Sequence, residues 1–150
     1  MNERKKLLAR ETGTFYKDGG IQVALIYPNS YFVGMSNLGF QTIYRQLNTT
    51  PGVSCQRIFL AEHIRSLEKG NLPTSFEILA FSVSFELDYI NVLKILGAAS
   101  IPLRSSERDD SHPLVIAGGF APSSNPEPLA MFVDIFIIGE GEEVINEFMD

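Results

Sequence analysis

Two short apolar runs near the end of the chain, residues 114–117 and 133–138, constrain its fold more than any other feature. Each run is too short for a helix, and each ends in a glycine-rich turn, built from Gly118 and Gly119 or from Gly139, Glu140 and Gly141. Short continuous apolar runs are typical of strands buried on both faces, as in parallel sheets covered by helices. Because open α/β sheets bind ligands at the carboxyl ends of their strands, these turns predict a ligand-binding edge.

The same alternation of short apolar runs and helical spacing recurs through the chain. Strands are predicted at residues 22–27, 53–60 and 77–83, and helices at residues 38–47, 62–69, 87–99 and 142–150, with a short helix after Pro126. Units of strand and helix about 25–30 residues long are those of βα repeats, whose right-handed crossovers produce a parallel sheet. The sequence therefore predicts a three-layer, flavodoxin-like α/β fold with five parallel strands in the order 2-1-3-4-5.

The domain is expected to span residues 21–150, preceded by an N-terminal extension at residues 1–20. Within the extension, the turn at residues 18–20 is a hairpin signal, and residues 12–16 are predicted to form a short additional edge strand.

The predicted strand order places the topological switch point between the first and third strands. Residues 28–34 and 82–88 then lie on the two sides of the expected crevice, with the two glycine-rich turns further along the same edge. The candidate cofactor-binding residues are Asn29, Ser30, Gly34, Ser82, Ser84, Gly118, Gly119, Gly139, Glu140 and Gly141.

Several of these residues have a structural alternative. Ser82 and Ser84 are either strand-end hydroxyls bonded to backbone or hydrogen-bonding groups for a ligand, and we expect only one of them to face a given side of the sheet. The pair Gly118 and Gly119 indicates either close approach of a flat group or a tight turn alone. Acidic residues at positions 140, 142 and 143 either complement the dipole of the last helix or contact a ligand or neighbouring domain.

Composition excludes several functions. The net charge of −6 argues against nucleic-acid binding, and the basic cluster at residues 4–6 is expected to be solvated. A single cysteine, Cys55, excludes an internal disulfide and an iron–sulfur cluster held by this chain alone, and is expected to pack beside the second strand. Without a signal peptide or membrane span in the sequence, a cytoplasmic location is expected.

Familiar catalytic and cofactor motifs are missing from the sequence. It contains neither a phosphate-binding P-loop nor a GxGxxG turn after the first strand, and no nucleophile–base pair. His63, at the start of the helix expected over residues 62–69, and His112, before the fourth strand, lack metal-ligand spacing and are expected to be solvated or capping residues. No metal ligand and no catalytic residue is predicted.

Three segments together resemble a known family: QVALIYPNSYFVGMSNLGFQTIYRQLN, FEILAFSVSFELDYINVLKIL and PLVIAGGFAPSSNPEPLAMFVDIFIIGEGEEVI. Over residues 20–150 the chain closely resembles the N-terminal, cobalamin-binding-like domain of certain radical S-adenosylmethionine (radical SAM) proteins. The resemblance implies that a C-terminal radical SAM barrel of the same polypeptide, with a [4Fe–4S] cluster and S-adenosylmethionine, is the partner of this domain. The amphipathic helix at residues 142–150, where the sequence stops, favours the same interpretation of the chain as a fragment.

The resemblance also implies a seat for a corrinoid. Its dimethylbenzimidazole tail would enter near Ser82 and Ser84, where Gly118 and Gly119 leave room, and its ring would lie over residues 28–34 and 139–141. Cobalamin domains that ligate cobalt use an Asp-x-His-x-x-Gly motif after the first strand, whereas residues 27–34 here contain no histidine. Any corrinoid would therefore lack a protein imidazole ligand.

The resulting hypothesis is a cobalamin-binding-like domain without catalytic activity of its own, which holds a corrinoid for the barrel. One alternative is a degenerate domain that binds no cofactor and docks a substrate or partner; the bulky side chains of Tyr31, Phe32 and Phe85 would favour it if they fill the crevice. The other alternative is a flavin- or nucleotide-binding module, for which Asn29 and Ser30 would supply the phosphate loop.

Overall fold

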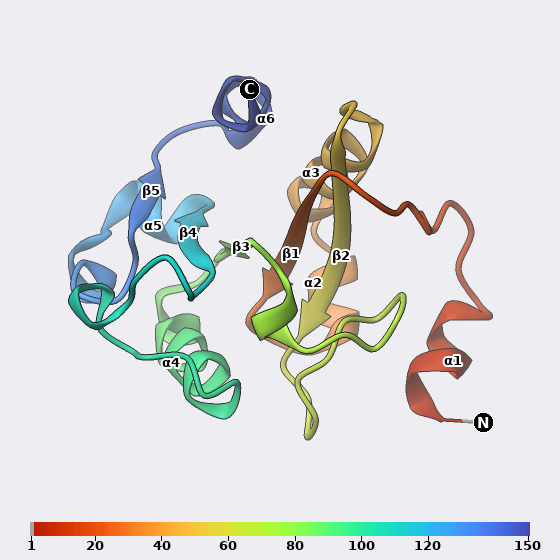
Figure 1. Ribbon diagram of the computed structural model, residues 1–150, viewed down its shortest axis with the longest axis horizontal. Coiled ribbons are helices and arrows are strands. Elements are labelled where there is room, and N and C mark those ends of the chain that lie inside the picture. Colours follow the sequence, from red (N-terminus) through yellow and green to blue (C-terminus); the bar gives the residue numbers. More distant parts are fainter. Residues whose placement is uncertain (1) are drawn as a thin grey trace.

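A computed structural model describes residues 2–150 and shows five parallel strands in the order β2-β1-β3-β4-β5, as predicted (Figure 1). The strands are β1 (Ile21–Tyr27), β2 (Val53–Phe59), β3 (Ile78–Ser82), β4 (Leu114–Gly118) and β5 (Ile135–Ile137). The helices are α1 (Glu3–Leu8), α2 (Tyr31–Met35), α3 (Leu38–Thr49), α4 (Tyr89–Ala98), α5 (Phe120–Ser124) and α6 (Gly141–Met149). Short 3-10 turns lie at η1 (Pro73–Ser75), η2 (Glu86–Asp88), η3 (Ser105–Glu107) and η4 (Glu127–Leu129). The flavodoxin-like prediction is confirmed.

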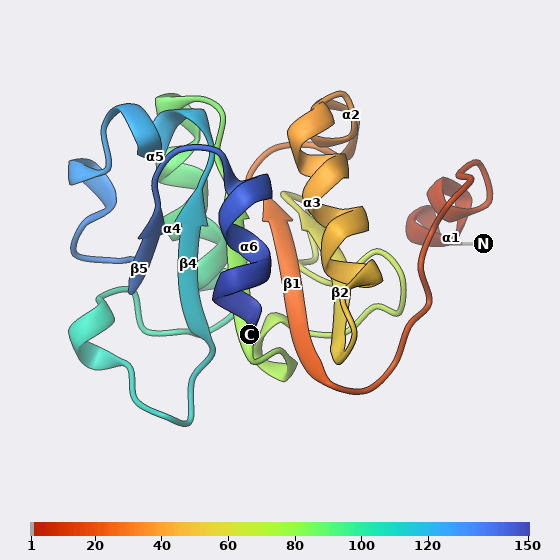
Figure 2. The ribbon, with the colours of Figure 1, turned by 90° about the horizontal axis from the view of Figure 1, so that it is seen from above.

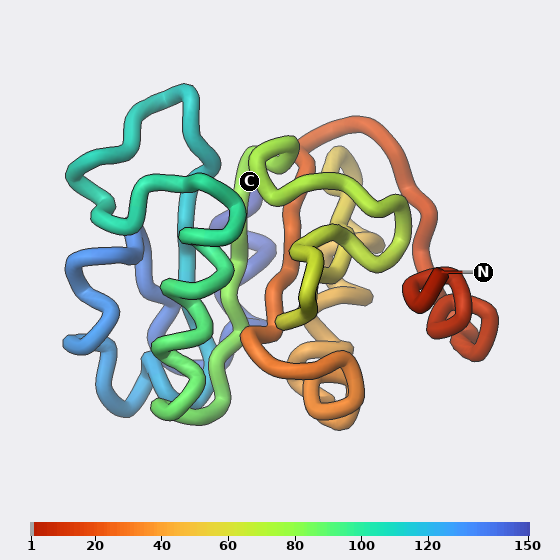
Figure 3. Tube along the Cα trace, turned by 90° about the horizontal axis from the view of Figure 1, so that it is seen from below, coloured from red at the N-terminus to blue at the C-terminus, as the bar shows by residue number. Residues whose placement is uncertain are grey.

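Apolar side chains on alternate strand positions build a core on each face of the sheet, because successive residues of a strand point to opposite faces. One core contains Leu25, Ala80 and Ile116 and is covered by α3 and α6, which lie side by side in Figure 2. The other core contains Leu79 and Val115 and is covered by α4 and by irregular segments, which are nearer the viewer in Figure 3. These two cores make the three layers.

The helix predicted at residues 62–69 is wrong. The segment is a loop that pairs with the edge strand β2: the backbone N–H of Leu67 donates to the Arg57 carbonyl at 2.7 Å, and the Arg57 N–H donates to the Glu68 carboxylate at 2.8 Å. The Ser66 hydroxyl donates to the side chain of Gln56 at 2.6 Å. The helical pattern does not decide the structure here, because these residues instead form hydrogen bonds with groups along the edge of β2.

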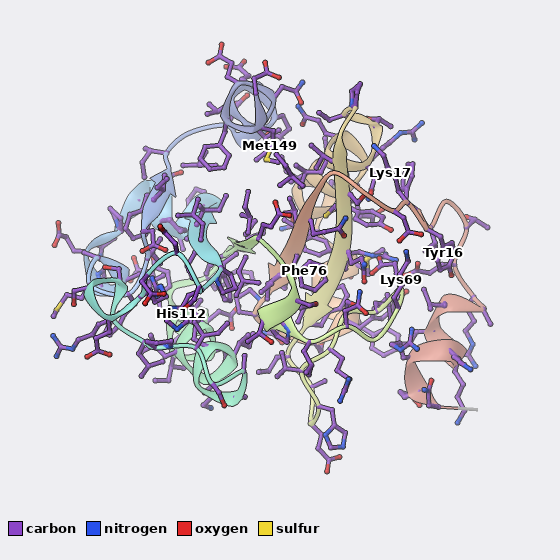
Figure 4. The ribbon with its side chains drawn as sticks, viewed as in Figure 1. Tyr16, Lys17, Lys69, Phe76, His112 and Met149 are labelled. Carbon is purple, nitrogen blue, oxygen red and sulfur yellow. The ribbon has the colours of Figure 1, made fainter. Side chains whose placement is uncertain are left out.

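The edge strand predicted at residues 12–16 is also wrong, because side chains rather than a strand ladder attach this segment. The Tyr44 hydroxyl accepts a hydrogen bond from the Phe15 N–H at 3.0 Å. The Lys17 ammonium donates to the carbonyls of Asn48 and Thr50 at 3.2 and 2.8 Å. Figure 4 shows Tyr16, Lys17 and Lys69 on the β2 side of the sheet.

The basic cluster at residues 4–6 is not wholly solvated. The guanidinium of Arg4 donates to the carbonyls of Leu67 and Glu68 at 2.8 and 2.9 Å and so attaches α1 to the loop beside β2. Residues 2–17 therefore form an arm that covers the edge of β2, and all seven residues of that strand are buried. No helix within residues 2–150 is both long and apolar enough to span a membrane.

Candidate functional site

A pocket of about 490 Å³ opens at the carboxyl edge of the sheet, between its strands and helices α3 and α6. Its floor is apolar and comes from three adjacent strands through Leu25, Ala80 and Ile116. The helices contribute Ile43 and Ile145 to its walls. Ligand pockets for small molecules commonly have volumes of about 300–1,000 Å³, so this one is large enough for a bound group.

The pocket exists because α6 packs against α3 and leaves part of the sheet uncovered. Gln46 on α3 donates to the carbonyl of Glu142 at 2.8 Å, and Thr50 contacts the side chain of Asn146 at 3.3 Å. Among its own residues, α6 buries Ile145. The small side chain of Ala80 and the bare backbone of Gly118 leave the space beneath the helix open.

Seven of the ten predicted site residues line this pocket: Ser82, Ser84, Gly118, Gly119, Gly139, Glu140 and Gly141. The expectation that only one of the two serines would face a given side was wrong. Residues two apart in an extended chain point to the same face, so the hydroxyls of Ser82 and Ser84 both lie on the side of Ala80.

Three predicted residues lie outside the pocket and have local roles. The side-chain oxygen of Asn29 accepts the Ser30 N–H at 2.7 Å, and the Ser30 hydroxyl caps α2 by accepting the Val33 N–H at 3.3 Å. At Gly34, a Cβ would lie 2.6 Å from the ring of Phe59, so close packing requires glycine there.

The crevice expected between residues 28–34 and 82–88 is bridged by hydrogen bonds. The amide of Asn29 donates to the Asp88 carboxylate at 3.1 Å, and Asn91 donates to the Pro28 carbonyl at 3.0 Å. The open volume instead extends along the edge over β1, β3, β4 and β5, as far as the two glycine-rich turns. Sequence reasoning placed the edge and the side with Ser82 and Ser84 correctly, but not the side expected at residues 28–34.

The two glycines after β4 differ in role. Gly119 has φ +109°, and a Cβ there would lie 2.6 Å from the carbonyl oxygen of Val83, so the backbone that approaches it is the chain's own. Gly118 lies on the floor of the pocket, where a Cβ would meet Ile137 at 3.4 Å, an ordinary contact. A side chain at position 118 would thus occupy ligand space rather than break the fold.

Hydroxyl groups form the polar wall of the pocket. The Ser84 hydroxyl oxygen accepts from the Tyr27 hydroxyl at 3.1 Å and from the Asn37 amide at 3.0 Å. The Ser123 hydroxyl accepts the Gly139 N–H at 3.0 Å and so links α5, which follows β4, to the turn after β5. Asn37, which also caps α3, and Ser123 were not among the predicted site residues, because no motif distinguishes a capping asparagine, or a serine in a five-residue helix, from a binding residue.

The charge in the pocket is negative. Glu140 and Glu142 line its mouth, and no Lys, Arg or His of residues 2–150 is among its lining side chains. A phosphate in this pocket would therefore have no cation to bind and two carboxylates nearby. The pocket suits an uncharged or cationic group.

Large apolar side chains are exposed at the carboxyl edge of the sheet, in the segments that follow β1, β3, β4 and β5. We call this set the apolar rim; each member is more than half exposed: Phe32, Leu38, Phe85, Leu87, Phe120 and Ile138. Tyr31 lies away from the pocket and, like Phe32 and Phe85, is not among its lining residues. An exposed apolar set of this kind is typical of a surface that contacts a ligand or another protein surface.

The remaining titratable candidates lie elsewhere. His63 is exposed in the loop after β2, and His112 lies at the amino edge beside Asp109, where Figure 4 labels it. Cys55 is buried in β2, as expected, and burial raises the pKa of its thiol. No cluster of three or more metal-ligating side chains occurs within residues 2–150.

The fold and the pocket define a flavodoxin-like α/β domain with a ligand-sized cavity at the carboxyl edge of its sheet. Residues 39–150 match the family described as radical SAM proteins, N-terminal, and the chain belongs to that family.

A curated protein of Methanocaldococcus jannaschii, itself named as uncharacterized, is 28% identical over 134 residues, which cover 85% of this chain and 27% of that protein. The chain thus spans about a quarter of that relative's length. No solved structure matches the present chain.

Proposed function

We propose that this domain holds a corrinoid at the carboxyl edge of its sheet and presents it to a radical SAM barrel in the same polypeptide. The observation that carries the proposal is the 490 Å³ pocket, with its apolar floor, at the turns where the family resemblance predicts the dimethylbenzimidazole tail. The corrinoid would supply organocobalt chemistry to the barrel. The chain's own residues would bind and orient it.

The lining fits the dimethylbenzimidazole base of a corrinoid, and the phosphate of the tail would lie outside the pocket, away from Glu140 and Glu142. The flat tail would lie on the strand floor, where Gly118 presents bare backbone and where a side chain would fill the same space. Ser82, Ser84 and Ser123 offer hydroxyls along one wall, and the apolar rim would lie beneath the corrin ring. The absence of histidine from residues 27–34 implies that the domain holds the corrinoid without ligating cobalt.

The flavin or nucleotide alternative is disfavoured at the loop that was predicted to bind its phosphate. Flavodoxin-like domains that bind a nucleotide hold its phosphate with backbone N–H groups or cations. Here Asn29 and Ser30, the residues predicted to form that phosphate loop, use their polar groups in a local turn and a helix cap.

The docking alternative is favoured by one observation, the apolar rim. A domain without a cofactor would use that surface to contact a protein partner directly. It predicts that blocking the pocket has no effect on the function of the whole protein, whereas charged substitutions on the rim do.

The test is a titration of the 150-residue chain with hydroxocobalamin and methylcobalamin, followed by absorbance and calorimetry. Ser82→Phe and Gly118→Ala place atoms in the pocket and are expected to weaken binding, the former more strongly. Ser106→Phe, at an exposed position away from the pocket, is the matched control and is expected to bind normally.

A longer polypeptide that contains the barrel is titrated in parallel. Binding by that polypeptide alone would mean that the barrel completes the site. Absence of binding by both would refute the corrinoid proposal and leave the docking role.

A further inference from the structure

The direction of one proton in the pocket follows from the hydrogen bonds of Ser84. A hydroxyl has one proton to donate and two lone pairs that accept. The Asn37 side-chain oxygen accepts the Phe40 N–H at 2.9 Å and caps α3, which fixes the orientation of its amide. Its NH₂ group must therefore donate to Ser84, at 3.0 Å.

The second lone pair of the Ser84 hydroxyl accepts a hydrogen bond from Tyr27. Tyr27 is 1% exposed, and among residues 2–150 the oxygen of Ser84, 3.1 Å away, is the hydrogen-bond partner of its hydroxyl. If Ser84 donated to Tyr27, the tyrosine proton would be buried without an acceptor, which is unfavourable. Tyr27 is therefore the donor, and both lone pairs of Ser84 are occupied.

The proton of Ser84 has no acceptor among residues 2–150 and belongs to a side chain that lines the pocket. We infer that Ser84 is the specificity-determining donor of this pocket, with Asn37 and Tyr27 as its positioning residues. The bound group carries an uncharged hydrogen-bond acceptor, such as a ring nitrogen or a carbonyl. The nearby carboxylates of Glu140 and Glu142 disfavour an anionic acceptor at the same place.

This inference rests on the pocket's being the ligand site of the proposed function, but it does not require the ligand to be a corrinoid. A pair of small probes separates the two claims. 1-Methylbenzimidazole and 1-methylindole have the same shape and are both uncharged at pH 8, and they differ in one ring nitrogen that accepts a hydrogen bond. Binding is measured by NMR chemical-shift titration of the ¹⁵N-labelled chain.

Wild-type chain is expected to bind 1-methylbenzimidazole about tenfold more tightly than 1-methylindole, the ratio that one hydrogen bond provides. Ser84→Ala is expected to abolish the preference by removing the donor. Asn37→Asp is expected to abolish it as well, because aspartate keeps the cap of α3 but accepts the Ser84 proton in place of the ligand.

Asn37→Asp separates a role of Asn37 in positioning the Ser84 proton from a role in stabilising the fold. Aspartate caps a helix as well as asparagine does, so the free energy of unfolding should remain unchanged or rise while the preference is lost. Binding of 1-methylindole should stay the same in all variants and so reports an intact pocket. Tyr27→Phe frees one lone pair of Ser84 and is expected to reduce the preference only partly.

Equal affinity of wild-type chain for the two probes, no binding of either probe, or a preference that survives Ser84→Ala would each overturn the inference. The hydroxocobalamin titration is read separately. If the preference holds and hydroxocobalamin does not bind, the inference stands and the corrinoid proposal fails. If hydroxocobalamin binds equally to wild type, Ser84→Ala and Asn37→Asp and no preference is seen, the corrinoid proposal stands and this inference fails.

Discussion

Replacement of Glu11 by glutamine tests whether the N-terminal arm is an integral part of the domain. The Glu11 side chain is 8% exposed, and its carboxylate accepts from the Arg57 guanidinium at 2.7 and 3.0 Å, from the Tyr31 hydroxyl at 2.6 Å and from the Thr14 hydroxyl at 2.7 Å. Glutamine keeps the shape but removes the charge and turns one oxygen into a donor that faces Arg57.

The magnitude follows from the number of bonds lost. Arg57 is 2% exposed and keeps Glu68, whose carboxylate lies 2.6 Å from its Nε, so the guanidinium does not become unpaired. At least one buried, charge-assisted hydrogen bond disappears, and such bonds contribute about 1.5–3 kcal/mol each. We expect Glu11→Gln to lower the free energy of unfolding by about 2–3 kcal/mol at pH 7.

The effect should depend on pH. Burial raises the pKa of Glu11, but hydrogen bonds from Arg57, Tyr31 and Thr14 outweigh it and hold the pKa below its ordinary value of 4.5. A carboxyl whose pKa is lowered by folding stabilises the protein above its unfolded pKa and loses that contribution as the pH falls through the folded value. The difference between wild type and Glu11→Gln should therefore be complete at pH 7 and shrink below pH 4.5.

The assay is urea unfolding followed by far-ultraviolet circular dichroism at pH 7 and at several values below 4.5. Glu62→Gln, at an exposed position in the loop after β2, is the matched control and should change stability by less than about 0.5 kcal/mol. A Glu11→Gln variant no less stable than this control would refute the argument that the arm is held by a buried ion pair.

Three further predictions follow from single positions. Gly119→Ala should destabilise the chain by about 2 kcal/mol or more, because φ is +109° and the new Cβ would lie 2.6 Å from the backbone of Val83. Gly97→Ala, in open space on α4, should instead stabilise the chain by about 0.5–1 kcal/mol. Urea unfolding measures the stability of both variants, and equal effects would contradict the reasoning. The buried thiol of Cys55, whose pKa is raised by burial, should react with a thiol reagent only when urea unfolds the chain, and fast labelling of folded chain would count against its burial. Burial and the hydrogen bond to Glu11 raise the pKa of Tyr31 to about 12, so the contribution of Tyr31 to stability should be complete below pH 10 and lost as the pH rises through about 12. The pKa is measured as the difference between the ultraviolet titrations of wild type and Tyr31→Phe, and ionisation of Tyr31 near pH 10 would disprove the prediction.

The strands and their order were predictable because the signals are local and strong. Each strand is a short apolar run with turn residues at its end, and the connections of βα units are almost always right-handed. These rules place the glycine-rich turns after β4 and β5 at the same edge as the serines after β3, and seven of ten candidate residues do line one pocket there.

The errors arose where hydrogen bonds to another element outweighed the local propensity of a segment. Residues 62–69 have helical spacing, but Leu67 and Glu68 form hydrogen bonds with Arg57 at the edge of β2 and lie in a turn of a loop. Residues 12–16 have strand composition, yet Tyr44 and Lys17 hold them in an irregular path. A local propensity does not report a partner on another element, whether 11 residues away, as for Arg57 and Glu68, or 29, as for Phe15 and Tyr44.

Local sequence thus determined the sheet, its parallel order and the edge at which a ligand-sized space would lie, because periodicity and handedness act over one or two elements at a time. Tertiary structure alone decided where along that edge the space opens and which way its donors point. Because α6 packs on α3, the sheet is left uncovered at Ala80. A hydrogen bond links Asn29 to Asp88 across the expected crevice. The direction of the Ser84 proton depends on Tyr27 and Asn37, two residues brought to it by folding, because a hydroxyl has no fixed direction until its neighbours occupy its lone pairs.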